Sequence, residues 1–116
     1  MLDGAEKPPA VIVLDRALEI FGPNGEHWRQ DYIYDRHGNH CILGAIRQAR
    51  RDTHIKPKLD QTEKLLATRL CRERFGPDCS DQEMLMLFNN ASGRTFEEIR
   101  DLMIWGLETA LRSDEK

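Results

Sequence analysis

Apolar residues recur at helical spacing from the first part of the chain onward. The first apolar stripe consists of Val11, Leu14, Leu18 and Phe21, with Ala17 on the same side. Residues three or four positions apart lie on one face of an α-helix, so this stripe predicts an amphipathic helix. Pro8-Pro9 suits a helix start, because proline fixes φ and its missing N–H costs nothing there. Gly22-Pro23-Asn24-Gly25 ends the helix.

The same spacing predicts four more helices. We expect them over about residues 41–51, about 60–75, about 81–88 and about 95–112. Two of these helices begin with a capping box, in which an N-terminal hydroxyl and a glutamate three residues later satisfy each other's backbone amides. The pairs are Ser80 with Glu83 and Thr95 with Glu98.

The segment between the first two helices has a different pattern. Tyr32, Ile33 and Tyr34 are residue types that favour strands, and the following residues 35–39 are typical of a turn. The segment is therefore either a small β-hairpin or an extended loop. The fold class that we predict is mainly α, a single-domain bundle of about five helices with this hairpin as an alternative after the first helix.

The size and composition agree with one helical domain. The chain has 116 residues, of which 40% are hydrophobic and 32% charged, as in a globular protein. No internal repeat or linker divides it, so we expect one domain over residues 8–112. Residues 1–7 and 113–116 are expected to be flexible termini.

Charge, hydropathy and cysteine content narrow the choice of partner and location. Seventeen basic and twenty acidic residues give a net charge of −3, which makes nucleic acid an unfavourable partner. No apolar run approaches the ~20 residues of a membrane span, and the N-terminus lacks the features of a secretory signal. Cys41, Cys71 and Cys79 form an odd set, as expected for reduced thiols. We therefore predict a cytoplasmic protein without membrane contact.

Several separated motifs resemble those of a family of small bacterial and phage proteins of unknown function. The motifs are Trp28, Asp35-x-x-Gly38, Cys41-x-Leu43-Gly44-Ala45 and Phe88-Asn89-Asn90-x-x-Gly93-Arg94-Thr95. They occur in the family's order, and the resemblance covers roughly residues 11–112. It implies a shared fold but no activity. Family members more often carry Trp-Asn-Asp where this chain has Phe88-Asn89-Asn90, so one carboxylate is absent here.

Cys41 is the strongest candidate for chemistry. At the first turn of a helix, unpaired backbone amides favour a thiolate. A thiol enzyme or redox protein could use Cys41 as nucleophile, His40 or His37 as base, and Asn89 or Asn90 to orient that base. The alternative is that Cys41 is a small apolar residue that fills a tight helix contact, as most buried free cysteines do. The sequence favours this alternative and a protein that is not an enzyme.

The spacing His37-x-x-His40-Cys41 could also supply three zinc ligands, with His54, Cys71 or Cys79 as a fourth. Structural zinc sites more often present paired C-x-x-C or H-x-x-x-H units, and neither unit occurs in this sequence. Histidines in an exposed turn are the simpler interpretation. We therefore expect neither a metal nor another cofactor.

A basic cluster spans the end of the second helix and the connection that follows it. Its cations are Arg47, Arg50, Arg51, Lys56 and Lys58. Such a cluster could bind an anionic macromolecule and make the protein a regulator of it. It also complements the negative end of the helix dipole, which is the simpler explanation. No aromatic residue is interleaved in this stretch of sequence to stack on bases.

The last helix carries a tryptophan on the wrong side for the core. Its apolar stripe consists of Phe96, Ile99, Met103, Gly106 and Ala110, whereas Trp105 lies opposite, among charged residues. Either the chain's own segments cover this indole, or it contacts another chain, since tryptophan is enriched at interfaces. We predict a non-enzymatic binding protein that self-associates as a homo-oligomer or binds a protein partner. Its contact would combine Trp105, Ile104 and Leu111 with a rim of Glu98 and Arg112.

Overall fold

The computed structural model describes residues 7–114, with the side chain of Asp114 excepted. The elements in this range are α1 (Pro9–Phe21), α2 (Ile42–Thr53), α3 (Pro57–Asp60), α4 (Thr62–Ala67), the 3₁₀ turn η2 (Arg72–Arg74), α5 (Asp81–Asn90) and α6 (Phe96–Asp114). The mainly helical fold class is therefore confirmed. Among these helices, none combines the length and the apolar composition needed to cross a bilayer.

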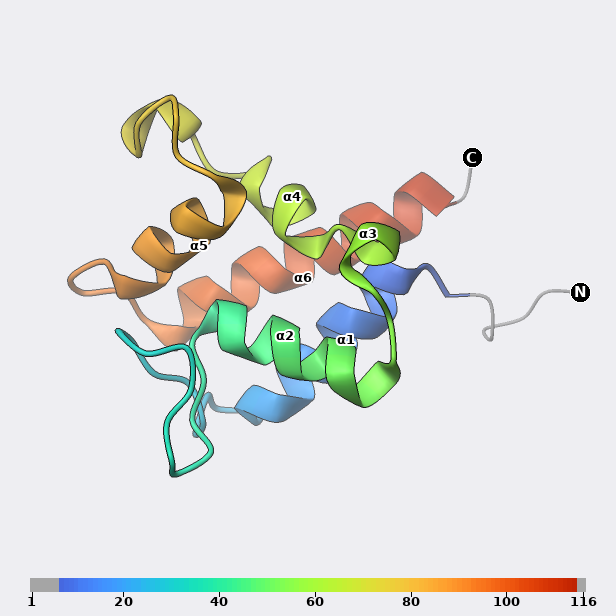
Figure 1. The fold of residues 1–116 in the computed structure, drawn as a ribbon, viewed down its shortest axis with the longest axis horizontal. Coiled ribbons are helices and arrows are strands. Elements are labelled where there is room, and N and C mark those ends of the chain that lie inside the picture. The colour runs from blue at the N-terminus through green and yellow to red at the C-terminus, as the bar shows by residue number, and fades with distance from the viewer. Residues whose placement is uncertain (1–6, 115–116) are drawn as a thin grey trace, which may run out of the picture.

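The helices pack around one hydrophobic core. α1 packs against α2 and α6. α4 and α5 pack against each other, and in addition α4 packs against α6 and α5 packs against α2 (Figure 1). The core includes Leu14 and Phe21 of α1, Ile46 of α2, and Ile99 and Met103 of α6, all without solvent exposure. The stripes that the sequence predicts on the first and last helices thus face inward.

Local signals place the helix ends where the sequence predicts them. α1 begins at Pro9 and ends before Gly22, whose φ of +87° a side chain would oppose. Both capping boxes are present. Ser80 Oγ accepts the backbone N–H of Glu83 at 3.1 Å, and Thr95 Oγ1 accepts that of Glu98 at 3.3 Å.

The single helix predicted over about residues 60–75 is wrong, because three shorter elements occupy this range. Gln61 adopts the left-handed conformation with φ of +48° and separates α3 from α4. The carboxylate of Asp60 turns inward to the guanidinium of Arg50 and also accepts the backbone N–H of Thr62 at 3.0 Å. This buried contact outweighs the helical periodicity of the sequence.

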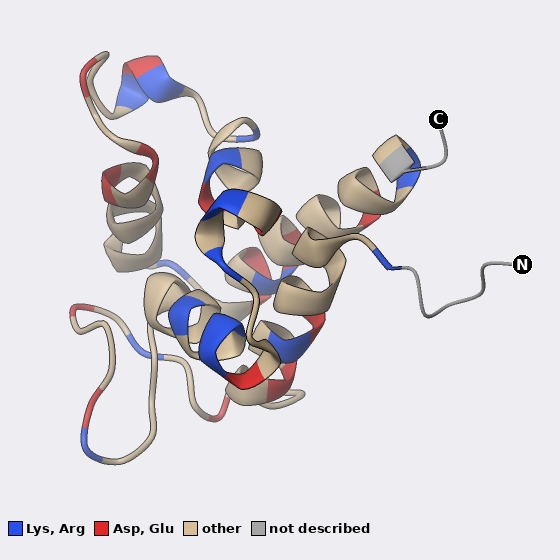
Figure 2. Ribbon diagram, turned by 45° about the vertical axis from the view of Figure 1, so that its right-hand side comes forward, with Lys and Arg blue, Asp and Glu red and all other residues tan. Residues whose placement is uncertain are grey.

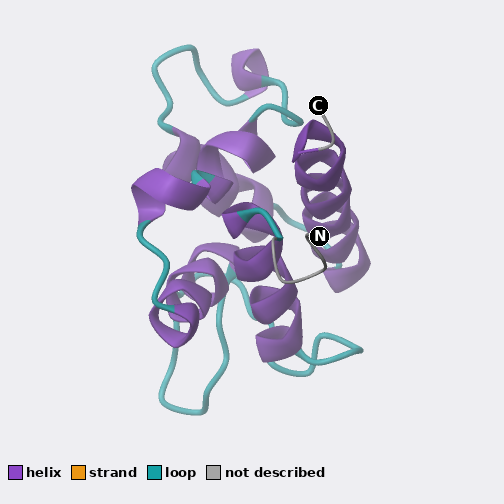
Figure 3. Ribbon diagram, turned by 90° about the vertical axis from the view of Figure 1, so that its right-hand side faces the viewer, coloured by secondary structure: helices purple, strands orange, loops and turns teal. Residues whose placement is uncertain are grey.

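The β-hairpin is also wrong, and the extended loop is what forms. Residues 22–40 contain only isolated bridges, Trp28 to His40 and Tyr34 to His40, and Figure 3 shows this segment as loop. Asp31, with φ of +77°, interrupts the extended stretch. The Asp35 side chain accepts the backbone N–H groups of His37 and Asn39, so the predicted turn forms although no strand ladder extends from it.

Two other boundaries differ from prediction. Asn89 and Asn90 form the last turn of α5 rather than a loop, and α6 continues to Asp114, beyond Arg112. Of the predicted flexible termini, residues 1–6 and 115–116 lie outside the described residues.

Candidate functional site

The buried side chain of Asn89 joins three segments that are distant in the sequence. Its Oδ1 accepts the indole N–H of Trp28 at 2.7 Å and the backbone N–H of Ile42 at 3.1 Å. Its Nδ2 donates to the carbonyl of Arg29 at 3.1 Å and to Oδ1 of Asn90 at 3.0 Å. Both ends of the amide are therefore satisfied, which is what a buried polar side chain requires.

Asn90 and Gln30 complete this contact, which we call the asparagine joint (Trp28, Gln30, Asn89 and Asn90). Asn90 Oδ1 accepts the backbone N–H of Asp31 at 2.7 Å, and Gln30 Nε2 donates to the carbonyls of Asn89 and Ala91 at 3.0 and 2.9 Å. Both hydrogen bonds to Asn90 use it as an acceptor. A carboxylate could accept the same bonds, so an aspartate at position 90 would leave this role intact.

Cys41 lies beneath the loop at the start of α2. Its side chain is fully buried, its Sγ accepts the backbone N–H of Gly44 at 3.4 Å, and it contacts Sδ of Met86 at 3.5 Å. Burial raises the pKa of the Cys41 thiol. The loop backbone passes so close to α2 that position 44 has to be glycine, because a Cβ there would lie 1.8 Å from the carbonyl oxygen of Ile33. Cys41 and Gly44 thus fit the loop to α2.

The histidines are not brought into a catalytic arrangement with Asn89. The four hydrogen bonds of the Asn89 amide go to Trp28, Ile42, Arg29 and Asn90. Burial lowers the pKa of His40, and its Nδ1 has no hydrogen-bond partner among the described residues. In the same part of the chain, no group of three or more His, Cys, Asp or Glu side chains is placed to hold a metal ion.

The other motif residues also make local contacts. Asp35 accepts from the Arg29 guanidinium at 2.8 Å, and this bond, with backbone N–H donors, holds its pKa well below the usual value. Arg94 donates to the carbonyl of Phe88 at 2.7 Å, and its guanidinium lies 3.8 Å from the centre of that ring. The motifs that suggest the family thus stabilise the fold around the asparagine joint.

A different region gathers the predicted basic cluster. The end of α2, the segment leading to α3 and the starts of α4 and α5 border an open pocket of about 680 Å³, which we call the basic pocket. Figure 2 shows Lys and Arg residues on α2 and along the segment into α3. The pocket is lined by Arg47, Arg50, Arg51, His54, Ile55, Lys56, Pro57, Glu63 and Gln82. Lys58, the fifth predicted cation, is exposed but is not among these lining residues.

The cations of the basic pocket are not equivalent. Arg50 is buried, and its guanidinium donates to Asp60 at 2.9 and 3.0 Å and to Glu63 at 2.7 Å. Burial opposes its charge, but the hydrogen bonds with Glu63 and Asp60 outweigh this effect and raise the pKa of Arg50. Two carboxylates thus already neutralise Arg50. Arg47, Arg51 and Lys56 have no carboxylate within 4.0 Å in the described range 7–114.

Trp105 lies half-buried at the edge of the core. The guanidinium of Arg69 is 5.6 Å from the centre of its ring, a contact that sequence spacing could not indicate. The indole borders a hollow of about 330 Å³ that also includes Arg94, Glu98 and Asp101. Of its predicted apolar neighbours, Ile104 is half-buried and Leu111 is 41% exposed. Arg112 is exposed, and it donates to Thr109 Oγ1 at 3.3 Å.

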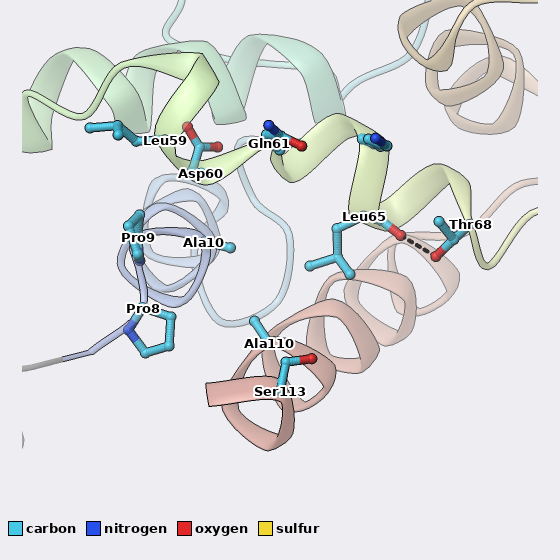
Figure 4. Close-up of a pocket in the computed structure, with 11 residues that line it drawn as sticks. Pro8, Pro9, Ala10, Leu59, Asp60, Gln61, Leu65, Thr68, Ala110 and Ser113 are labelled. Carbon is cyan, nitrogen blue, oxygen red and sulfur yellow. Dashed lines mark hydrogen bonds between the residues drawn. The ribbon is translucent and has the colours of Figure 1, made fainter. Parts of the chain in front are cut away.

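Another pocket, of about 450 Å³, lies between the start of α1, the α3–α4 corner and the end of α6 (Figure 4). Pro8, Ala10, Leu65 and Ala110 give it largely apolar walls. The carboxylate of Asp60 at its edge is engaged by Arg50. This pocket therefore offers apolar surface and little charge for recognition.

The fold is that of a small helical protein. Its sequence motifs hold the asparagine joint together, and the basic pocket lies in a different region of the molecule. The chain belongs to a family of unknown function, DUF6197, whose model matches residues 6–104. No curated protein and no solved structure matches the chain.

Proposed function

We propose that this protein is a non-enzymatic, cytoplasmic binding protein that holds an anionic group of a macromolecular partner in the basic pocket. The observation that supports the proposal is the convergence of Arg47, Arg51 and Lys56 without ion-pair partners among residues 7–114. Some arginines outside the pocket are neutralised, as in the pairs Arg29–Asp35 and Arg72–Asp81, and others, such as Arg36 and Arg74, also have no ion pair among these residues, so the proposal depends on the convergence of the cations on one pocket.

Like charges that share one pocket repel each other, and an anion bound there would relieve this repulsion. The interaction is electrostatic, so it weakens as salt screens charges beyond about 8 Å at physiological ionic strength. Arg50 supports the pocket from beneath. Because Asp60 and Glu63 hold its guanidinium, it positions the end of α2 against α4 rather than facing the partner.

Charge reversal tests this proposal. Labelled polyglutamate and a labelled oligothymidylate serve as polyanion probes, and fluorescence anisotropy reports their binding at low and at high salt. We expect Arg47→Glu with Arg51→Glu to weaken binding of at least one probe by about tenfold or more. Lys58→Glu is the matched control, because Lys58 carries the same charge but does not line the pocket. Equal affinity of wild type, double variant and control for every probe would refute the proposal.

A second candidate function is self-association through α6. Glu98, Trp105 and Arg112 follow one another at intervals of seven residues, so they form one strip along the helix surface. Trp105 is midway between the two charged residues. If two copies pack their α6 helices antiparallel about Trp105, Glu98 of each copy faces Arg112 of the other. Ile104 and the exposed Leu111 would add apolar area beside the strip.

The solution mass tests self-association. Wild type is expected to sediment as a dimer, and Trp105→Ala and Arg112→Glu are expected to shift it toward monomer. Arg112 is exposed at the end of α6, so its replacement should leave folding unchanged. Arg100→Glu, on another side of the same helix, is the control that should remain dimeric. A monomer for wild type at high protein concentration removes this candidate.

A further inference from the structure

We infer that the occupant of the basic pocket is a short acidic segment of another protein that carries an aliphatic side chain between its carboxylates. This inference rests on the proposed function, because it names the partner of the same pocket. It depends on three features of the pocket: its floor, the placement of its cations and the charge of its surroundings.

The apolar part of the pocket lining consists of Ile55 and Pro57, and we call it the floor. Ile55 is half-buried against the core, and Pro57 lies beside it at the start of α3. Among the described residues that line the pocket, His54 carries the one aromatic ring, and no Phe, Tyr or Trp is present. A leucine-like side chain can pack against the floor, whereas a nucleic-acid base would have a single imidazole on which to stack.

The cations flank this floor along the sequence, with Arg47 and Arg51 before Ile55 and Lys56 after it. Arg47 and Arg51 are one helical turn apart on α2, and Lys56 follows the end of the helix. Gln82, from the start of α5, adds an amide that can hydrogen-bond to a peptide backbone. Carboxylates on either side of an apolar side chain would therefore meet cations, and the volume of about 680 Å³ has room for such a segment.

The surroundings favour a short anion over a long one. The chain carries a net charge of −3 although the pocket has four cations and one carboxylate, so the rest of the chain is acidic. A nucleic-acid backbone that extended far beyond the pocket would run along a chain whose remaining residues have a net negative charge. A segment of a few residues would not.

The experiment compares two peptides on the wild-type protein, so that it does not depend on a variant that folds. One labelled peptide has a leucine between two Asp-Glu pairs, and the other has glycine in place of that leucine. We expect the leucine peptide to bind roughly tenfold more tightly, because only its side chain packs on the floor. Arg47→Glu with Arg51→Glu should weaken binding of both peptides.

Replacing Ile55 provides the matching test on the protein. Ile55→Ser should reduce the advantage of the leucine peptide while leaving the affinity of the glycine peptide unchanged. A circular dichroism spectrum like that of wild type and a cooperative thermal transition above the assay temperature establish that this variant folds, although the loss of core contact should lower its melting temperature.

Equal affinity for the two peptides overturns the inference. Tighter binding of oligothymidylate than of the leucine peptide, lost on charge reversal of Arg47 and Arg51, also overturns it but supports the proposed function. If no probe responds to the charge reversal, the proposed function fails, and the inference fails with it.

Discussion

Replacing Asn89 and Asn90 one at a time by aspartate tests the structural role of the asparagine joint. Asn89→Asp keeps an acceptor for Trp28 and Ile42, but it replaces the Nδ2 donor by an oxygen. That oxygen would face the carbonyl of Arg29 and Oδ1 of Asn90, which are now 3.1 and 3.0 Å from Nδ2. Asn90→Asp keeps both hydrogen bonds that Asn90 now accepts. The two variants thus add the same charge at neighbouring positions with different consequences.

The magnitude follows from the contacts. Asn89→Asp loses two hydrogen bonds, at about 1 kcal/mol each, and buries a carboxylate without a cation, which costs about 1–3 kcal/mol more. We expect unfolding free energy to fall by about 3–5 kcal/mol at neutral pH. With an m-value of about 1–3 kcal/mol/M in urea, the midpoint falls by roughly 1–5 M. Asn90→Asp should change the unfolding free energy by less than about 1 kcal/mol.

Urea unfolding followed by far-ultraviolet circular dichroism measures both variants, and its pH dependence adds a second readout. Burial should raise the folded-state pKa of the new carboxyl at position 89 above its unfolded value of about 3.9. The defect should therefore be small below about pH 3.9 and should grow as pH rises through the folded-state pKa. Equal midpoint shifts for the two variants at neutral pH would refute a specific role of Asn89 as donor and acceptor.

Three further predictions concern the loop and the thiols. Helix propensity alone predicts that Gly44→Ala stabilises α2 by about 1 kcal/mol. Because the new Cβ would meet the carbonyl oxygen of Ile33, we expect instead that urea unfolding shows a net loss of about 1–3 kcal/mol in the free energy of unfolding. In the folded protein two thiols should react quickly with iodoacetamide and Cys41 only after unfolding, whereas a fast third thiol titrating below about pH 8.5 would support the thiol-enzyme alternative. The lowered pKa of Asp35 beside Arg29 stabilises the fold above about pH 3.9, and this contribution is lost as pH falls through the folded-state pKa. The free energy of unfolding of Asp35→Asn should therefore depend less steeply on pH in the acid range than that of wild type. An unchanged dependence would contradict the stabilising role of the Asp35 carboxylate.

Much of the candidate site was present in the sequence as residue types but not as an arrangement. The cations of the basic pocket are close together in the chain, so their clustering could be predicted. The aliphatic floor and the burial of Arg50 could not, because both depend on how α2 meets α3 and α4. The same limit applies to Trp105, whose contact with Arg69 joins residues far apart in the sequence.

The sequence by itself determined the features that arise from neighbours within one or two helical turns. These are the inward stripes of α1 and α6, the stop at Gly22 and the two capping boxes, for which the interacting groups are three or four residues apart. Only the tertiary structure decided the break at Gln61 and the loop over α2. In both places a hydrogen bond between separate segments satisfies a buried polar group, from Arg50 to Asp60 at the break and from Ile42 to Asn89 under the loop. The free energy of such a hydrogen bond exceeds the small local preference for helix or strand.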